Sequence, residues 1–252
     1  MKRLFPLLLL LTFLFACREN STPRINSDGV AVKIDPLDSI NALIKSEPSN
    51  AELYFERAKE YYAKRNLISA LSDIGRVLKL DSSKADYYIL LADLKLIGKQ
   101  SRESKDALLK AHQIEPKNIN ALLRLGELYM VVEDYKTSFD YLNQALQIDI
   151  HSATAYRLKG FNYKYAGDTA QAVSSFRTAI EQDPNDYDSY MQLGLLFSIP
   201  LSPLALDYYD NALRIKPSSA EALYAKALHL QYIENPREAL SVYDQIIELN
   251  PQ

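Results

Sequence analysis

Residues 153–184 read ATAYRLKGFNYKYAGDTAQAVSSFRTAIEQDP, and this stretch carries the pattern that decides the fold. It holds two segments with apolar residues at helical spacing, separated by Gly167-Asp168, and it ends at Pro184. Aspartate is a favoured N-cap of a helix, and proline stops a helix that runs into it. The stretch therefore predicts a hairpin of two helices.

The same pattern recurs along the chain at a nearly fixed interval. Successive markers are 34 residues apart, except for one step of 33: Pro48, Ser82, Pro116, Ile150, Pro184, Pro217 and Pro251. A period in this range is typical of a solenoid, in which one supersecondary unit stacks on the next. We therefore expect six hairpins, beginning near residues 51, 85, 119, 153, 187 and 220.

Aligned on these starts, each repeat has places that hold one kind of side chain. The eighth place is always small: Ala58, Ala92, Gly126, Gly160, Gly194 and Ala227. The twentieth place is small as well, allowing for one deletion in repeat five: Ala70, Ser104, Ser138, Ala172, Ala205 and Ala239. The twenty-fourth place is bulky: Ile74, Leu108, Leu142, Phe176, Tyr209 and Tyr243. Small residues at the first two places let two helices approach closely, and a larger residue there would overpack the contact.

This register resembles that of the tetratricopeptide repeat family over about residues 51–252. The resemblance implies an all-α, right-handed solenoid of six helical hairpins. Residues 36–46 predict one more amphipathic helix, with Leu37, Ile40, Leu43 and Ile44 on one face. We expect this helix to cap the first repeat, so that the solenoid occupies residues 36–252.

The N-terminus has the features of an export signal. Met1-Lys2-Arg3 is cationic and precedes twelve apolar residues, fewer than the roughly 20 that a membrane-spanning helix needs. Leu14-Phe15-Ala16-Cys17 then resembles a bacterial lipobox. We expect residues 1–16 to be a signal peptide, Cys17 to be lipidated, and residues 17–35 to form a flexible tether. The alternative is an ordinary secretory signal in which Cys17 is incidental.

Export of this kind predicts a membrane-anchored lipoprotein of the bacterial cell envelope. Arg18 stands where some lipoproteins of the inner membrane carry an aspartate. We therefore expect the periplasmic face of the outer membrane. Cys17 is the single cysteine, so no disulfide can form within the chain.

The sequence offers no catalytic constellation. The three histidines, His112, His151 and His229, lie in different repeats and lack the spacing of metal or catalytic motifs. We interpret them as isolated surface or helix-packing residues. The net charge of −3 lacks the basic excess of nucleic-acid binders. We therefore expect no enzyme activity, no metal, no cofactor and no nucleic-acid partner.

The resemblance also implies a concave groove lined by places two, five, nine, twelve and thirteen of each first helix. Here these places are largely apolar, with basic side chains expected to orient a partner polypeptide, as an amphipathic helix or an extended segment. The predicted groove residues are Phe55, Lys59, Ile89, Leu123, Arg124, Arg157, Phe161, Lys164, Met191, Leu195, Tyr224 and Leu228. Some of the apolar ones could instead be buried between repeats. The same two alternatives remain open for Tyr62, Tyr165, Tyr224 and Tyr232, because exposed aromatics can anchor a partner.

The last repeat ends in a stripe of apolar residues, Tyr243, Ile246 and Leu249. We expect this C-terminal edge to be covered by a second copy, forming a homodimer, or by the partner. The function that these features predict is a non-catalytic scaffold or adaptor for secretion, pilus, outer-membrane or cell-wall assembly. A glycan- or nutrient-binding lipoprotein is the alternative, although the close spacing of the repeats leaves no long loops for such a site.

Overall fold

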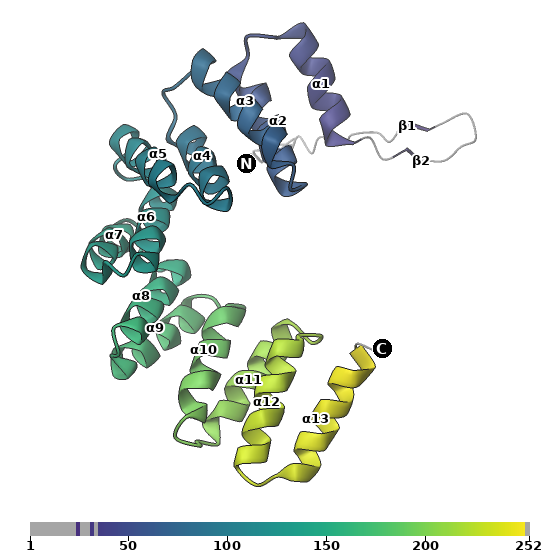
Figure 1. Ribbon diagram of the computed structural model, residues 1–252, viewed down its shortest axis with the longest axis vertical. Coiled ribbons are helices and arrows are strands. Elements are labelled where there is room, and N and C mark those ends of the chain that lie inside the picture. The colour runs from purple at the N-terminus through teal and green to yellow at the C-terminus, as the bar shows by residue number, and fades with distance from the viewer. Residues whose placement is uncertain (1–23, 26–30, 33–34, 250–252) are drawn as a thin grey trace, which may run out of the picture. The chain divides into compact units, whose positions relative to one another are not determined.

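The computed structural model describes residues 24–25, 31–32 and 35–249, and within these it contains thirteen α-helices and two short strands (Figure 1). The expected signal peptide and Cys17 lie outside the described residues. The chain divides into two compact units, Met1–Pro48 and Ser49–Gln252.

The first unit contains strands β1 (Arg24–Ile25) and β2 (Ala31–Val32), which pair antiparallel, and helix α1 (Pro36–Ser46). Asp35 caps α1, because its carboxylate accepts a hydrogen bond from the backbone N–H of Leu37 at 3.0 Å. Helix α1 coincides with the helix expected from the sequence, and its capping role stays a prediction. The strand pair differs from the structureless tether expected there. The sequence between the strands contains Asp28-Gly29, a pair typical of hairpin turns.

The second unit is built from six helical hairpins, as the repeat period predicted. The first helices are α2 (Ala51–Ala63), α4 (Ala85–Ile97), α6 (Ile119–Val131), α8 (Ala153–Tyr165), α10 (Tyr187–Ser198) and α12 (Ala220–Tyr232). The second helices are α3 (Leu67–Leu80), α5 (Ser101–Ile114), α7 (Tyr135–Ile148), α9 (Thr169–Gln182), α11 (Leu204–Ile215) and α13 (Pro236–Leu249). Each hairpin contacts the next one along the chain. The all-α repeat solenoid is thus confirmed.

The turn within each hairpin has a fixed backbone conformation. The fifteenth place of every repeat has a positive φ, between 53° and 83°: Arg65, Lys99, Glu133, Gly167, Leu201 and Glu234. A side-chain cap follows in three repeats, where Asn66, Asp134 and the predicted Asp168 each accept a hydrogen bond from the backbone N–H three residues on. Repeat two lacks a side-chain cap at Gln100. In repeat five Pro203 occupies the N-cap position of α11, which begins at Leu204.

The small residues predicted at the eighth place are explained by contact with the twenty-fourth place. A Cβ atom added to Gly160 would lie 2.7 Å from the ring of Phe176, and one added to Gly126 would lie 2.6 Å from Leu142. At the twentieth place, the Ser138 hydroxyl donates to the Gly126 carbonyl at 2.6 Å. Each hairpin therefore closes around one bulky side chain seated against a residue with little or no side chain.

Candidate functional site

The apolar residues predicted for the groove divide into buried and accessible ones. Phe55 and Met191 are buried, and the ring of Phe55 packs edge-on against Tyr87 of the next repeat, with ring centroids 4.8 Å apart. Leu195 and Tyr224 are exposed. The remaining four are half-buried: Ile89, Leu123, Phe161 and Leu228. Phe55 therefore stabilises the contact between repeats, which was one of the two alternatives that the sequence left open.

The basic residues predicted to orient a partner are already engaged within the chain. Arg124 on α6 donates to Asp93 on α4 at 3.3 Å and to Glu127 at 3.1 Å. Arg157 on α8 donates to Asp186, just before α10, at 2.9 Å. Each of these two arginines thus bridges two neighbouring repeats, and their role in orienting a partner stays a prediction.

The two predicted groove lysines are engaged as well. Lys59 pairs with Glu56 one turn earlier at 2.6 Å, and Lys164 donates to Gln192 of the next repeat at 2.6 Å. Burial lowers the pKa of Lys164, whereas burial raises the pKa of Asp93, with Arg124 opposing that rise. The contacts of Arg124, Arg157 and Lys164 each join two neighbouring repeats, whereas that of Lys59 lies within α2. Sequence analysis missed this because each partner lies on another turn or another repeat.

A row of exposed apolar side chains runs along the ends of the first helices. It occupies the thirteenth place of five consecutive repeats, and its members are 38–81% exposed. We call it the edge row: Ile97, Val131, Tyr165, Ile199 and Tyr232. Sequence analysis noted only its tyrosines. The whole row could have been predicted from the recurrence of an apolar residue at the thirteenth place of five consecutive repeats.

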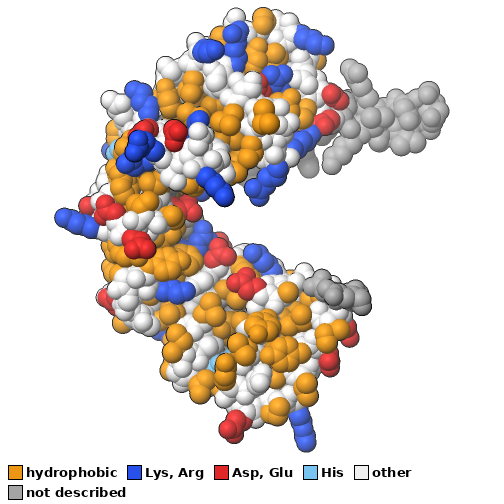
Figure 2. All heavy atoms as spheres, viewed as in Figure 1, with side chains coloured by type: hydrophobic (Ala, Val, Ile, Leu, Met, Phe, Trp, Pro, Cys, Tyr) orange, Lys and Arg blue, Asp and Glu red, His pale blue; other side chains and the backbone are white. Residues whose placement is uncertain are grey.

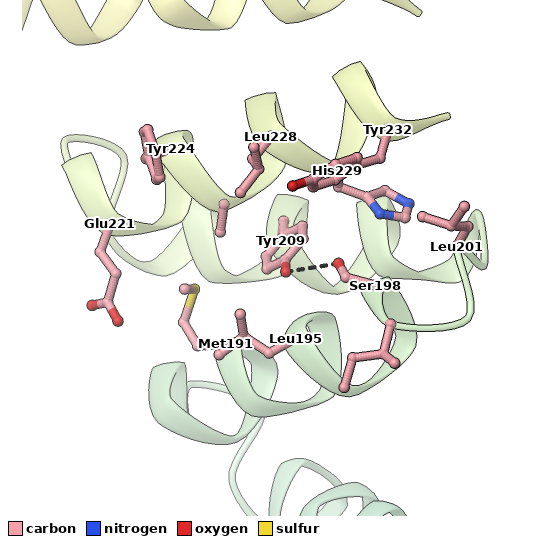
Figure 3. A pocket seen from close by; sticks show the side chains of 12 residues that line it. Met191, Leu195, Ser198, Leu201, Tyr209, Glu221, Tyr224, Leu228, His229 and Tyr232 are labelled. Carbon is pink, nitrogen blue, oxygen red and sulfur yellow. Dashed lines mark hydrogen bonds between the residues drawn. The ribbon is translucent and has the colours of Figure 1, made fainter. Parts of the chain in front are cut away.

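The largest recess described lies between α10 and α12, with α11 beneath it (Figure 3). This α10–α12 pocket has a volume of about 630 Å³. Met191 and Leu195 reach it from α10, while Tyr224 and Leu228 reach it from α12. The full lining is Met191, Leu195, Ser198, Ile199, Leu201, Tyr209, Glu221, Tyr224, Ala225, Leu228, His229 and Tyr232. Figure 2 shows apolar side chains gathered over this part of the molecule.

The structure therefore brings only some of the predicted groove residues together. Met191, Leu195, Tyr224 and Leu228 share the α10–α12 pocket. A second recess of about 310 Å³, lined largely by polar and charged residues, includes Leu123, Arg124 and Arg157. The other five line neither recess: Phe55, Lys59, Ile89, Phe161 and Lys164.

The exposed apolar residues of the last helix, α13, are largely not those predicted for the C-terminal edge. Tyr243 and Ile246 are half-buried, because they pack on the core of their own hairpin, which includes Leu223 and Leu230. Leu249 is exposed. The more exposed apolar residues of α13 are Leu240 at 63% and Ile247 at 65%. Their counterparts in repeat five, Leu206 and Leu213, pack against the first helix of repeat six.

Among residues 24–25, 31–32 and 35–249, no group of three or more histidine, cysteine or acidic residues is arranged to hold a metal ion. None of the described helices is both long and apolar enough to cross a bilayer.

Comparison with known proteins places the fold. Residues 159–220 match a family model described as tetratricopeptide repeat. Human tetratricopeptide repeat protein 13 is 25% identical over 159 residues, which is 61% of this chain but only 18% of the relative. The chain thus spans less than a fifth of the length of that curated relative.

Two solved structures show the same architecture. PilW, described as a widely conserved type IV pilus biogenesis factor, superposes with a TM-score of 0.71 at 16% identity, covering 79% of this chain and 92% of PilW. YrrB, described as a TPR protein with an unusual peptide-binding site, gives a TM-score of 0.53 at 26% identity, covering 75% of this chain and 98% of YrrB. With its six hairpins and the matched repeat model, the chain is a tetratricopeptide repeat protein.

Proposed function

We propose that this protein is a non-catalytic scaffold that holds a partner polypeptide against the ends of its first helices. The observation that carries the proposal is the edge row, which repeats one exposed apolar side chain in five consecutive repeats. Contiguous exposed apolar surface usually marks an interaction site. A row with the period of the repeats suits a polypeptide lying across several of them. The peptide-binding site named for YrrB supports the same class of function.

The edge row replaces the charged part of the predicted groove as the primary contact surface. Arg124 and Arg157 are occupied by Asp93 and Asp186, so attracting an acidic segment would require breaking existing ion pairs. Val131 and Tyr165 require no such exchange, because both are exposed and line a common recess of about 260 Å³. An apolar segment of the partner would dock there with little loss of existing contacts.

Capture of the partner from an envelope extract tests this proposal. The full chain serves as bait in mild detergent, with the double variant Val131→Asp/Tyr165→Asp beside it. We expect the variant to recover at least tenfold less partner, because a buried unpaired carboxylate is costly at an apolar contact. The matched control is Ile68→Asp/Leu204→Asp, which changes two exposed apolar residues on second helices. Equal recovery by both double variants would refute the edge row as the docking surface.

The place of action that we propose is the bacterial envelope, with the chain anchored through a lipidated Cys17 on the periplasmic face of the outer membrane. The lipobox-like sequence Leu14-Phe15-Ala16-Cys17 and the role in type IV pilus biogenesis named for PilW support this. Labelling with a fatty-acid analogue should mark the native chain and leave Cys17→Ala unmarked. An adaptor role in secretion, pilus, outer-membrane or cell-wall assembly follows from the same proposal.

A homodimer through α13 is part of the proposal. Its support is the exposure of Leu240 and Ile247, which project from the last described helix. Light scattering should then give twice the chain mass for the native protein and the single mass for Ile247→Glu. No feature of the described residues favours the alternative function, glycan binding. Calorimetric titration with oligosaccharides would reveal it.

A further inference from the structure

A second row of exposed residues runs beside the edge row, two places further along each repeat. It occupies the fifteenth place, where every repeat has a positive φ between 53° and 83°. We call it the turn row: Arg65, Lys99, Glu133, Gly167, Leu201 and Glu234. Because the backbone conformation is shared, these side chains leave equivalent points of the six turns. The repeats therefore differ here in side-chain chemistry alone.

The charge of the turns changes sign along the array. At places fourteen to sixteen, repeats one and two carry only basic charges, and repeats three and four carry only acidic ones: Lys64, Arg65 and Lys99, against Glu133, Asp134 and Asp168. Repeat five carries no charge at these places, which read Pro200-Leu201-Ser202, and repeat six carries Glu234. A polypeptide lying along the edge row thus passes positive turns, then negative turns, and then an apolar turn.

Glu133 of the turn row shares a recess with two members of the edge row. This recess of about 260 Å³ is lined by Met130, Val131, Glu133, Tyr135 and Tyr165. Glu133 is the one charged residue in that lining. Lys136 and Lys164 are close in sequence, but neither lines the recess, and Lys164 donates to Gln192.

This recess suits a basic residue of the partner. Lysine and arginine have an apolar stem and a cationic end, and the stem can cover apolar surface while the charge stays accessible. The stem would pack on Val131 and Tyr165, and the cation would meet the Glu133 carboxylate. The Tyr165 ring would add to the attraction for a cation. An acidic side chain would meet a like charge instead.

The far end of the edge row suits an apolar residue. Ile199 and Tyr232, the last two members of the row, line the α10–α12 pocket together with Leu201 of the turn row. No lysine or arginine lines this pocket, and Glu221 is its one acidic residue. Its volume of about 630 Å³ has room for a bulky apolar side chain, the kind of anchor on which interfaces commonly depend.

We propose that the partner presents an extended segment with a fixed order of residues: acidic at repeats one and two, basic at repeats three and four, and bulky apolar at the α10–α12 pocket. This inference rests on the proposed function, because it specifies which polypeptide the edge row holds. Packed helices lie roughly 10 Å apart, and an extended residue rises roughly 3.3 Å. About three residues of the partner therefore cover one repeat.

Fluorescence anisotropy with two labelled synthetic peptides tests this order on the full chain. Each peptide has three blocks of about six residues, one block for two repeats. In the Glu-first peptide the blocks are glutamate alternating with leucine, lysine alternating with leucine, and leucine with tryptophan. The Lys-first peptide exchanges the glutamates and lysines, so that both have the same composition. We expect the Glu-first peptide to bind at least tenfold more tightly, and the difference to shrink near 0.5 M salt.

Charge exchange within the turn row provides matched variants. Lys99→Glu introduces the residue that repeats three and six carry at this place, and Glu133→Lys introduces that of repeat two, so both tolerate the positive φ. Each should weaken binding of the Glu-first peptide about threefold to tenfold, because an attraction becomes a repulsion. The double variant Lys99→Glu/Glu133→Lys should prefer the Lys-first peptide. The control Glu234→Lys makes the same exchange opposite the apolar block and should change the affinity less than about twofold.

The outcomes separate the charge order from the docking surface, with circular dichroism confirming that each variant is folded. Equal affinity for the two peptides, or no change of preference in the double variant, would overturn the charge order. If both peptides bind equally and Val131→Asp/Tyr165→Asp loses both, the edge row still holds a polypeptide and only the order is wrong. If the native chain binds neither peptide and light scattering shows a dimer that Lys99→Glu dissociates, the occupant of the turns is a second copy and the proposal fails.

Discussion

Two junctions between repeats differ in their side chains at equivalent places. One joins repeats three and four, and the other joins repeats five and six. In the first, Asn162 bonds to Ser138 and Leu158 is buried. In the second, His229 meets no partner and Ala225 leaves a pocket of about 630 Å³. The same backbone frame therefore accommodates a junction with a recess of about 310 Å³ and one with a recess of about 630 Å³. A few side chains at the sixth, tenth, twelfth and twentieth places decide which one forms.

Exchanging leucine and alanine at the sixth place should give the largest difference between the two junctions in the free energy of unfolding. Leu158→Ala removes a buried side chain from the filled junction, and we expect it to lower the free energy of unfolding by about 2–5 kcal/mol. Ala225→Leu enters existing space in the open junction, so it should cost less than about 1 kcal/mol or stabilise the fold. Urea unfolding followed by circular dichroism measures both. Similar losses in the free energy of unfolding for the two variants would mean that the pocket cannot accommodate a leucine side chain at position 225.

Exchanging serine and alanine at the twentieth place should have an intermediate effect. Ser138→Ala removes the hydrogen-bond partner of the Asn162 Nδ2, whose Oδ1 is already without one among the described residues. We expect a loss of about 1–3 kcal/mol in the free energy of unfolding.

The reverse change, Ala205→Ser, offers His229 a hydroxyl and should gain about 0.5–1.5 kcal/mol. The same urea experiment measures it. A gain in stability from Ala205→Ser would show that the twentieth place decides whether the residue at the tenth place is paired. A loss of stability would indicate that the new hydroxyl cannot reach the ring.

The pH dependence of stability should show the smallest effect. Because burial lowers the pKa of His229, the unfolded chain takes up a proton near pH 6.5 that the folded chain does not. The contribution of this group to stability is therefore unchanged above about pH 6.5 and decreases as the pH falls below it. Between pH 7.5 and pH 5.5, the melting temperature of the native chain should fall further than that of His229→Leu. An equal fall in both would place the titrating group elsewhere.

The repeat pattern was enough to predict the hairpins, because it depends on residues close in sequence. The starts expected at residues 51, 85, 119, 153, 187 and 220 coincide with the first residues of α2, α4, α6, α8, α10 and α12. The need for a small residue at position 160 was predictable for the same reason, because the ring of Phe176, which a Cβ there would meet, lies in the same hairpin.

The functional surfaces were harder to predict, because they depend on neighbours one repeat away. Arg124 and Arg157 bond to Asp93 and Asp186, which lie 31 and 29 residues away in neighbouring repeats, so the spacing of residues within one helix does not reveal these two pairs. His229 resembled a routine helix-packing histidine. Only comparison of the tenth place across repeats, together with the small residue at the twentieth place of the preceding repeat, distinguishes it from Asn162.

The arginine bridges bear on how the array unfolds. Arg124 and Arg157 each tie one hairpin to the next, so they contribute to the coupling between folding units rather than to the stability of any single unit. In a linear array, the strength of this nearest-neighbour coupling decides whether units melt together or one after another. The Arg124 side chain is about half exposed, and salt screens such pairs strongly once the Debye length falls to about 3 Å near 1 M. Raising the ionic strength should thus weaken the coupling between repeats two and three, while the apolar cluster that these repeats share keeps them joined.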